Sequence, residues 1–262
     1  MNAVLLDGKS AIITGAGSGV GRASASRFAE EGARLVCADI HLDSVKETVR
    51  LLEMSGGTAV PVECDVSEES DIAAAVGVAV ETFGRLDIMF NNVGIPTPRL
   101  GALLEDHSVE DFDRLAAVNL RGVFLGCKYA VIQFKKQGGG GVILNTGSVA
   151  GLVGWGGTVY GATKGAVHQL TRAVAVEVAP FGIRVNAICP AAMPYTGFMA
   201  AGGMQLSGQD LEAAAAHSGS MHPLGRPIRA EDCAEAAVYL CSDRASNVTG
   251  ILMPIDGGYV AK

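Results

Sequence analysis

The chain has 262 residues, of which 49% are apolar, and a formal net charge of −7 at pH 7. This length allows one large domain or two small ones, while the acidic balance and the lack of a basic run argue against nucleic acid or an anionic membrane surface as a partner. No secretory leader pattern and no run of about 18 apolar residues is found, so we expect a cytoplasmic protein without a membrane partner.

Short apolar runs rich in β-branched residues alternate with longer helical stretches. In chain order, the predicted strands cover residues 10–14, 34–39, 58–64, 86–91, 142–146, 184–188 and 251–255. The predicted helices cover residues 20–31, 43–55, 68–83, 109–119, 122–136, 158–179, 209–217 and 230–242. This alternation favours an α/β fold with a parallel sheet covered on both faces. Because no repeat or linker divides the chain, we predict one doubly wound domain over residues 1–262, with ligands beyond the carboxyl ends of the strands.

The turn after the first strand is rich in glycine and leads into a helix. Residues 14–21 read TGAGSGVG. Glycines let the backbone approach a pyrophosphate, and the helix N-terminus offers free N–H groups to the anion. The order strand, loop, helix, strand is the context that this mechanism needs. The sequence therefore predicts a dinucleotide site, whereas the rival G-x-x-x-x-G-K-[ST] phosphate loop fails because Ala3 stands five residues before Gly8.

An acidic residue, Asp39, ends the second predicted strand. A carboxylate about 20 residues past the glycine loop can accept hydrogen bonds from the adenosine ribose and repels a 2′-phosphate. Ser18 brings no positive charge into the loop, and no arginine follows Asp39 directly. We therefore expect NAD(H) rather than NADP(H). The alternative is that Asp39 only caps the end of the strand and has no role in binding.

Tyr160 and Lys164 stand four residues apart in VYGATKGA, residues 159–166, and so share one face of a predicted helix. A free tyrosine has a pKa near ~10, and a nearby ammonium group favours the phenolate and lowers that pKa. The spacing is thus typical of a tuned acid/base group. Taken alone, it is also compatible with two ordinary surface residues.

Together, the motifs resemble those of the single-domain short-chain dehydrogenase/reductase family over almost the whole chain. The matching segments are T14-G15-x-x-x-G19-x-G21, Asp39, Cys64-Asp65-Val66, N91-N92-V93-G94, Val118-Asn119, Asn145-x-x-Ser148, Y160-x-x-x-K164, Cys189-Pro190 and Asp256-Gly257-Gly258. The resemblance implies a Rossmann-like parallel sheet of seven strands in the order 3-2-1-4-5-6-7, with helices on both faces. It also implies a homotetramer that assembles through the helices predicted at 122–136 and 158–179.

The resemblance further implies hydride transfer between NAD(H) and a small-molecule secondary alcohol or ketone. Tyr160 would be the general acid/base, Lys164 would lower its pKa and hold the nicotinamide ribose, Ser148 would bind the substrate oxygen, and Asn119 would help hold a water in a proton relay. Further cofactor contacts implied in this way are Gly15, Ser18, Gly19, Val20, Gly21, Asp39, Ile40, Asp65, Val66, Asn92, Gly94, Pro190, Met193 and Thr196. Without the other motifs, Ser148 and Asn119 are equally compatible with a strand end and a helix end.

The chain departs from the family pattern in several places. Ser148 and Tyr160 are twelve residues apart, one fewer than in most relatives. Pro190 is followed by Ala191 where relatives have glycine. By position, the threonine that contacts the carboxamide in relatives falls on Tyr195, with Thr196 one residue later. These departures leave the proposed chemistry intact and make the shape of the cleft an open question.

Residues 195–223 are expected to form a variable substrate lid. Its larger apolar side chains are Phe198, Met199, Met204, Leu206 and Met221, and its polar ones are Gln205, Gln209, Asp210, Glu212, His217 and His222. A methionine-rich wall suits an apolar substrate of steroid, terpene or cyclohexanol type. Several of these side chains could equally pack on a neighbouring subunit, and Trp155 could line the cleft, the core or an interface.

Other classes of protein fit less well. A 3-oxoacyl-carrier-protein reductase would favour NADPH and a basic surface, and both Asp39 and the negative net charge argue against these features. A sugar dehydrogenase on the same fold is a second alternative that the sequence leaves open. A nucleotide-binding regulator without turnover has no need of Ser148, Tyr160 and Lys164 together. The six cysteines form no C-x-x-C and the five histidines no H-E-x-x-H, so we expect no metal site and no disulfide.

Overall fold

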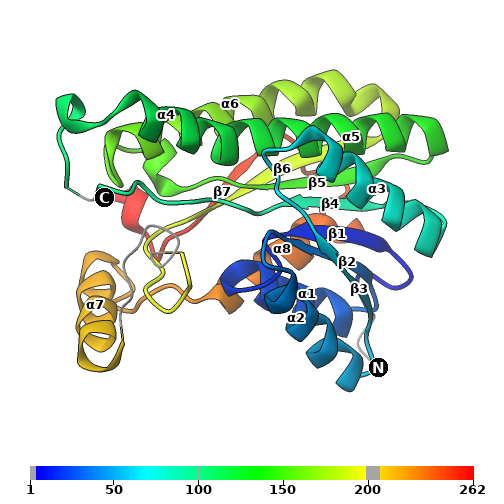
Figure 1. Cartoon of the computed structure of the whole chain (residues 1–262), viewed down its shortest axis with the longest axis horizontal. Helices are drawn as coiled ribbons and strands as arrows, with labels where there is room; N and C mark the ends of the chain where they lie inside the picture. The colour runs from blue at the N-terminus through cyan, green and yellow to red at the C-terminus, as the bar shows by residue number, and fades with distance from the viewer. Residues whose placement is uncertain (1–3, 100, 199–206) are drawn as a thin grey trace.

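The computed structural model of the chain describes residues 4–99, 101–198 and 207–262 (Figure 1). Its centre is a seven-stranded sheet in the order β3-β2-β1-β4-β5-β6-β7, in which all neighbours are parallel. The strands are β1 (Ser10–Thr14), β2 (Arg34–Asp39), β3 (Thr58–Glu63), β4 (Ile88–Asn91), β5 (Gly141–Thr146), β6 (Ile183–Pro190) and β7 (Leu252–Ile255). The predicted fold class and strand order are confirmed.

Helices cover both faces of this sheet (Figure 1). One face carries α1 (Gly19–Glu30), α2 (Leu42–Met54) and α8 (Ala230–Cys241). The other face carries α3 (Glu69–Phe83), α4 (Val109–Ala116), α5 (Gly122–Gln137) and α6 (Thr158–Val178). The helix α7 (Gly208–Met221) stands apart from the sheet, and short 3-10 turns cover Leu104–Asp106, Val149–Gly151, Ala179–Phe181, Asp243–Ala245 and Tyr259–Ala261.

The core consists of two apolar layers, one on each face of the sheet. Every residue of β1 is buried, and because side chains alternate along a strand, Ile13 faces the layer that contains Phe28 while Ile12 faces the layer that contains Phe134. This double burial explains why the strands read as continuous apolar runs in the sequence.

The two helices predicted at 109–119 and 122–136 are in fact one continuous helical stretch. A π-helical turn, Ala117–Arg121, joins α4 to α5, so that Val109–Gln137 runs on without a break. In length and composition this stretch could cross a membrane, but its second half, α5, packs on β4 and β5 in the core. Asn119 alone was compatible with a helix end, yet in the fold its amide is buried and paired inside the continuous helical stretch.

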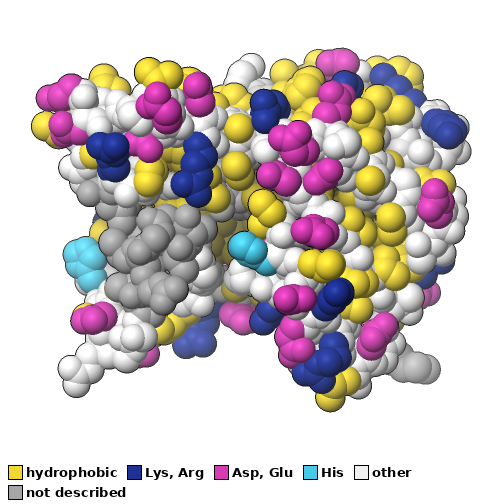
Figure 2. Space-filling view, viewed as in Figure 1, with side chains coloured by type: hydrophobic (Ala, Val, Ile, Leu, Met, Phe, Trp, Pro, Cys, Tyr) yellow, Lys and Arg dark blue, Asp and Glu magenta, His cyan; other side chains and the backbone are white. Residues whose placement is uncertain are grey.

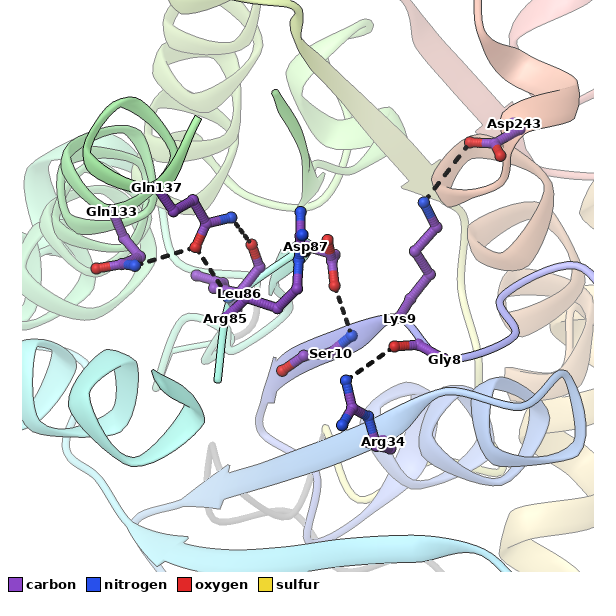
Figure 3. A network of polar contacts seen from close by, with 10 residues as sticks. All are labelled: Gly8, Lys9, Ser10, Arg34, Arg85, Leu86, Asp87, Gln133, Gln137 and Asp243. Atoms are coloured by element: carbon purple, nitrogen blue, oxygen red, sulfur yellow. Dashed lines mark hydrogen bonds and ion pairs between the residues drawn. The ribbon is translucent and has the colours of Figure 1, made fainter. Parts of the chain in front are cut away.

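The amino-terminal edge of the sheet is held by polar contacts between its own residues (Figure 3). The Ser10 N–H donates to Asp87 Oδ2 at 2.9 Å, and Arg34 Nη2 donates to the Gly8 carbonyl at 3.0 Å. Gln137 Oε1 accepts from the Leu86 N–H at 3.2 Å. Because these groups satisfy one another, the opposite, carboxyl-terminal edge is the one that can offer polar groups to a ligand.

Gly126 on α5 lies against a buried chain of amides. Asn91 Nδ2 donates to Asn145 Oδ1 at 2.9 Å, and Asn145 Nδ2 donates to Thr171 Oγ1 at 3.0 Å. A Cβ at position 126 would collide with Asn91 Oδ1. We expect Gly126→Ala to lower the free energy of unfolding by about 2–4 kcal/mol, because it overpacks the core and breaks a buried hydrogen bond.

Urea unfolding followed by circular dichroism measures this loss, with Gly77→Ala as the matched control. Gly77 is also inside a helix, α3, but a Cβ there meets nothing within 4 Å. Its replacement should stabilise the protein by about 0.5–1 kcal/mol through helix propensity. Equal effects of the two substitutions would contradict the predicted collision.

Candidate active site

The carboxyl ends of β1, β4, β5 and β6 meet along one edge of the sheet, where most of the predicted site residues lie. The glycine loop follows β1, residues 92–94 follow β4, Ser148 follows β5, and Pro190 ends β6. In the order of strands, β1, β4 and β5 are direct neighbours. The fold thus gathers segments that are far apart in the sequence.

The glycine loop takes a shape that only glycine allows at several positions. Gly15 and Gly19 have φ values of +70° and +49°, in the region that favours glycine. A Cβ at Gly21 would collide with the carbonyl oxygen of Gly15, so the first turn of α1 lies directly on the loop. The glycines therefore let the loop fold tightly onto the N-terminus of α1, whose free N–H groups are what a pyrophosphate site requires.

Asp39 turns back from the end of β2 over this loop. Its Oδ2 accepts a hydrogen bond from the Gly17 N–H at 2.9 Å, and its Oδ1 accepts from the His41 N–H at 2.9 Å. A Cβ at Gly17 would lie 2.7 Å from Oδ2. A carboxylate offers about four lone-pair positions, so two remain for a ligand. Ser18 and Ile40, both exposed, flank the same position.

Arg22 supports the loop from behind, a contact that the sequence did not reveal. Its guanidinium donates to the Gly17 carbonyl, and its Nε donates to Thr48 Oγ1 at 2.9 Å. Thr48 in turn donates to the Ala16 carbonyl at 2.9 Å. Both faces of the loop are thus fixed before any ligand binds.

Asp65 and Val66 lie next to Asp39 at the sheet edge. The Cys64 N–H donates to the Asp39 carbonyl at 2.9 Å, which places the two segments side by side. Asp65 Oδ1 accepts from the backbone and the hydroxyl of Ser67, at 2.9 and 2.7 Å. Val66 is buried.

Asn92 binds three strands together at the centre of the edge. Its side-chain N–H donates to the Thr14 carbonyl at 3.0 Å, while its Oδ1 accepts from Thr146 Oγ1 at 3.1 Å. Gly94, two residues further on, lies close to α6, since a Cβ at this position would be 3.3 Å from Lys164 Nζ. The predicted cofactor segment 92–94 therefore lies between the glycine loop and the Tyr160–Lys164 helix face.

Tyr160, Ser148 and Lys164 come together above β5. Tyr160 and Lys164 are both buried on α6, and the Ser148 side chain lies close enough to the Tyr160 hydroxyl to act on its pKa. Lys164 Nζ donates to the carbonyl of Thr146 at 2.7 Å and lies 5.9 Å from the centre of the Tyr160 ring. The shorter connection between Ser148 and Tyr160 therefore still lets the two side chains meet.

The predicted lowering of the Tyr160 pKa is wrong for the chain by itself. Burial raises the pKa of Tyr160 to about 12, and the hydrogen bond with Ser148 opposes this rise only in part. Burial also lowers the pKa of Lys164 to about 8. The ammonium group points to the Thr146 carbonyl, so the cost of removing the phenolate from water outweighs its attraction to Lys164.

Asn119 sits in the π-helical turn and is fully buried. Its Oδ1 accepts from the Ile95 N–H at 2.8 Å, and its Nδ2 donates to the Ile95 carbonyl at 2.9 Å. Nδ2 also lies 3.4 Å from Thr163 Oγ1 on α6. A π turn is frequent at functional sites because the extra residue redirects a side chain, and here it aims the amide at the segment that follows β4.

Thr196 and Met193 approach the site from the segment after β6. A Cβ at Gly19 would lie 3.3 Å from the Cβ of Thr196, so this threonine borders the glycine loop. Its hydroxyl donates to the Met193 carbonyl at 2.9 Å. Tyr195, which stands where relatives have threonine, instead contacts Glu212 on α7, with its hydroxyl 3.3 Å from Oε2.

Around Tyr160 the wall of the site is apolar. Leu115, Ala150 and Val159 form a buried cluster with it, and Ile95, Trp155 and Phe198 pack against this cluster. The Phe198 ring stands edge-on to Tyr160 with centroids 5.7 Å apart. The sequence left open whether Trp155 lines the cleft, the core or an interface. In the fold, Trp155 packs against this apolar wall and against Tyr259, with the two ring centroids 5.7 Å apart. The lid residues Met199, Met204, Gln205 and Leu206 lie outside the described residues.

His168 is a further residue beside the site that sequence reasoning missed. It is buried on α6 behind Ser148, with its Nε2 3.3 Å from the Ser148 amide nitrogen. The only signal in the sequence is its place four residues after Lys164, which continues the spacing from Tyr160.

The fold and this site define an oxidoreductase on a Rossmann-like sheet, and comparisons with known proteins agree. A family model described as enoyl-(acyl carrier protein) reductase matches residues 15–260. The chain belongs to the short-chain dehydrogenase/reductase family.

Curated relatives cover nearly the whole chain. An uncharacterized oxidoreductase of Thermotoga maritima is 43% identical over 97% of this chain and 98% of its own length. A 2,5-dichloro-2,5-cyclohexadiene-1,4-diol dehydrogenase of Sphingobium indicum is 40% identical over 98% of both chains.

Solved structures also match nearly the whole chain. A levodione reductase matches with a TM-score of 0.90 and 36% identity, covering 98% of this chain and 99% of its own. A 3-ketoacyl-(acyl-carrier-protein) reductase from Brucella melitensis, complexed with NADH, has a TM-score of 0.84 and 38% identity over 97% and 99% of the two chains.

Proposed function

We propose that the protein is an NAD(H)-dependent oxidoreductase that interconverts an apolar, cyclic secondary alcohol and its ketone. The observation that carries this proposal is the meeting of Tyr160, Ser148 and Lys164 in an apolar wall, beside a glycine loop that faces a carboxylate. Each group alone is also compatible with a purely structural role. Their convergence on one edge of the sheet from separate strands and helices favours a site for acid/base chemistry on a bound substrate.

The residues present fit a dinucleotide. The tight glycine loop at the N-terminus of α1 suits the pyrophosphate, and the free lone pairs of Asp39 suit the adenosine ribose. In this proposal Val20, Ile40, Asp65 and Val66 border the adenosine half, and Asn92, Gly94, Pro190, Met193 and Thr196 border the nicotinamide half. Bound there, the cofactor supplies hydride transfer.

In the proposed mechanism, Tyr160 moves the proton at the substrate oxygen. With its pKa raised to about 12, Tyr160 is protonated at neutral pH and can donate to a carbonyl oxygen as reduction proceeds. In the oxidation direction it must first lose that proton, which the positive charges of Lys164 and of an oxidised nicotinamide would favour. Ser148 donates to the same substrate oxygen, and Asn119 helps to hold a water that connects the site to solvent.

The apolar wall supports the choice of substrate class. Leu115, Val159, Trp155 and Phe198 leave few polar partners for the hydroxyl-rich ring of a sugar. The names of the cyclohexadienediol dehydrogenase and the levodione reductase support a cyclic substrate in the same way. Residues 195–223 form the substrate lid in this proposal.

A 3-oxoacyl-carrier-protein reductase is the second candidate. The family-model description and the match to the NADH complex of such an enzyme favour it. An acidic carrier protein requires a basic docking patch, whereas acidic and basic side chains are interspersed over the face in Figure 2. We therefore place the cyclic alcohol first.

A substrate panel tests both candidates. Nicotinamide absorbance would be followed with steroid, terpene, cyclohexanol, sugar and acyl-thioester substrates, each with NAD(H) and with NADP(H). Turnover of a cyclic alcohol or ketone with NAD(H) is the expected result. Turnover of the acyl thioester alone would transfer the assignment to the second candidate.

The cofactor choice has its own test in Asp39→Asn. The amide keeps an acceptor for the Gly17 N–H but removes the charge that repels a 2′-phosphate. We expect the preference for NAD over NADP, as a ratio of kcat/KM values, to fall about 100-fold. The matched control is Asp65→Asn, a nearby carboxylate already bonded to Ser67. An unchanged ratio in Asp39→Asn would contradict its role in selection.

We also propose a homotetramer, assembled through α5 and α6. These helices expose large apolar side chains, among them Phe124, Ile132 and Val176, the last 79% exposed. Burial of such side chains between subunits is favourable. Sedimentation analysis of the purified protein measures the assembly directly.

A further inference from the structure

His168 packs closely against the segment that carries Ser148, on both sides of that residue. A Cβ at Gly147 would collide with its Nε2, and a Cβ at Gly151 would lie 2.6 Å from its Cε1. The same Cβ would lie 2.7 Å from the Gly165 amide nitrogen, so the chain after β5 passes directly over α6. The ring therefore has one position, between α6 and the backbone on both sides of Ser148.

Two donors face Nε2. The Ser148 N–H donates to it at 3.3 Å, and the thiol of Cys189, at the end of β6, lies 3.3 Å away. Because a backbone N–H can only donate, Nε2 must be the unprotonated nitrogen of the ring, with the proton on Nδ1. Nδ1 is buried without a partner of ordinary hydrogen-bond geometry among the described residues, although the Gly151 backbone lies near enough to interact with the ring.

The surroundings keep the ring neutral. Burial lowers the pKa of His168 to about 4, and Lys164 and Arg172 on its own helix act in the same direction. From β6, Cys189 also faces the ring, and burial raises the pKa of that thiol to about 12, so it is not a thiolate. An acceptor at Nε2 is thus present throughout the pH range in which an acid/base reaction would be measured.

Ser148 is consequently fixed from two directions. Its Oγ accepts from the Ala150 N–H at 3.1 Å and lies 3.5 Å from the Pro190 carbonyl. Its backbone is held by His168 from the side of α6, the same helix that carries Tyr160. One helix therefore determines the relative position of the two hydroxyl groups.

We propose that His168 is a positioning residue for the reaction, which holds the Ser148 backbone through Nε2 and thereby sets the Ser148 hydroxyl against Tyr160. It touches neither substrate nor cofactor and acts through Ser148. The inference rests on the proposed function, because it assigns the purpose of this contact to the Ser148–Tyr160 pair.

Two substitutions separate positioning from packing. His168→Gln places an amide oxygen close to the position of Nε2 and keeps an acceptor, whereas His168→Leu fills the same space without one. We expect His168→Leu to lower kcat about 10–100-fold, because a small displacement of a catalytic group costs rates of this order. The affinity for NAD(H) should stay within about twofold, and His168→Gln should recover most of kcat.

The pH dependence adds a readout that loss of packing would not change. The hydrogen bond with Ser148 lowers the pKa of Tyr160. In a plot of rate against pH, the transition due to Tyr160 should therefore move to higher pH in His168→Leu. In His168→Gln this transition should stay in place. Cys189→Ala is the matched control, since it removes the other neighbour of Nε2 and keeps the His168 acceptor for the Ser148 N–H. Equal rates and profiles in His168→Leu and the wild type would overturn the proposal.

A measurement without turnover keeps this inference separate from the proposed function. Hydrogen exchange of the Ser148 amide, followed by NMR, should be at least about tenfold faster in His168→Leu than in the wild type or in His168→Gln. Lack of turnover in the wild type would refute the proposed function but not this contact. Should His168→Leu not fold, His168→Asn replaces it, because its shorter amide cannot reach Ser148. Equal losses in the Gln, Leu and Asn variants, or loss of folding in all of them, would overturn the proposal by showing a purely structural ring.

Discussion

Tyr160→Phe should lower turnover by about 10²–10⁴-fold and leave the affinity for NAD(H) nearly unchanged, the size of effect expected when a general acid/base group is removed. The substitution deletes one oxygen and keeps the ring, so the edge-on contact with Phe198 and the buried cluster with Leu115 and Val159 persist. The measurement is kcat on the substrate that the panel identifies, together with the Kd for NAD(H) from fluorescence titration.

The matched control for this loss is Tyr259→Phe. Tyr259 belongs to the aromatic group around Trp155, but it lies outside the cluster that contains Tyr160. Its hydroxyl has no part in the proposed proton transfer, so kcat should change by less than about threefold. Turnover that survives in Tyr160→Phe would refute the mechanism and leave the Tyr–Lys spacing with a role in packing alone.

Lys164→Met should abolish the reaction and yet make the protein more stable, by about 1–3 kcal/mol at pH 7. Lys164 is 1% exposed, and its charge is stabilised mainly by one bond to the Thr146 carbonyl. Methionine has a similar volume and needs no hydration, so the substitution removes the cost of a buried ammonium group. Urea unfolding of the cofactor-free protein measures the gain.

The gain should depend on pH in a defined direction. Burial lowers the Lys164 pKa from 10.5 to about 8, so the folded chain binds this proton less tightly than the unfolded chain. Below pH 8 both states carry the charge and the penalty is complete, and between pH 8 and 10.5 it disappears as the folded state releases the proton. The advantage of Lys164→Met is therefore largest at neutral pH and fades toward pH 10.5. Lys128→Met, at an exposed lysine on α5 bonded to Glu69, should show no such gain.

Much of the fold and part of the site were predictable because their signals are local. Glycines 15, 19 and 21, the acid at 39 and the spacing of Tyr160 and Lys164 each lie within a short segment, and the strands read as apolar runs. The strand order came from the resemblance to a family, since no local pattern states which strands pair. Helix ends were harder to place, and the stretch around Ala117–Arg121 read as a break although the helix continues through it, because Asn119 finds its partner on the distant segment that carries Ile95.

The contacts that the sequence did not reveal depend on residues far apart in the chain. His168 reaches Ser148 across twenty positions, and Arg22 reaches Thr48 across twenty-six. The direction of the Tyr160 pKa was missed for a related reason. A spacing of four shows that a lysine is near, but it does not show how much water the fold removes or that the Thr146 carbonyl competes for the ammonium group.

The two edges of the sheet differ in how well they should tolerate amino-acid substitutions. At the amino edge, Asp87 pairs with the Ser10 backbone and Gln137 pairs with the Leu86 backbone, so we expect most replacements there to destabilise the fold without changing the chemistry. At the carboxyl edge, the apolar wall around Tyr160 is supplied by several separate segments, among them α4, the turn after β5 and the segment before α7. Single substitutions in that wall can reshape substrate preference while the scaffold persists. Directed evolution of new ring substrates should therefore begin at Leu115, Trp155 and Phe198 and leave the opposite edge unchanged.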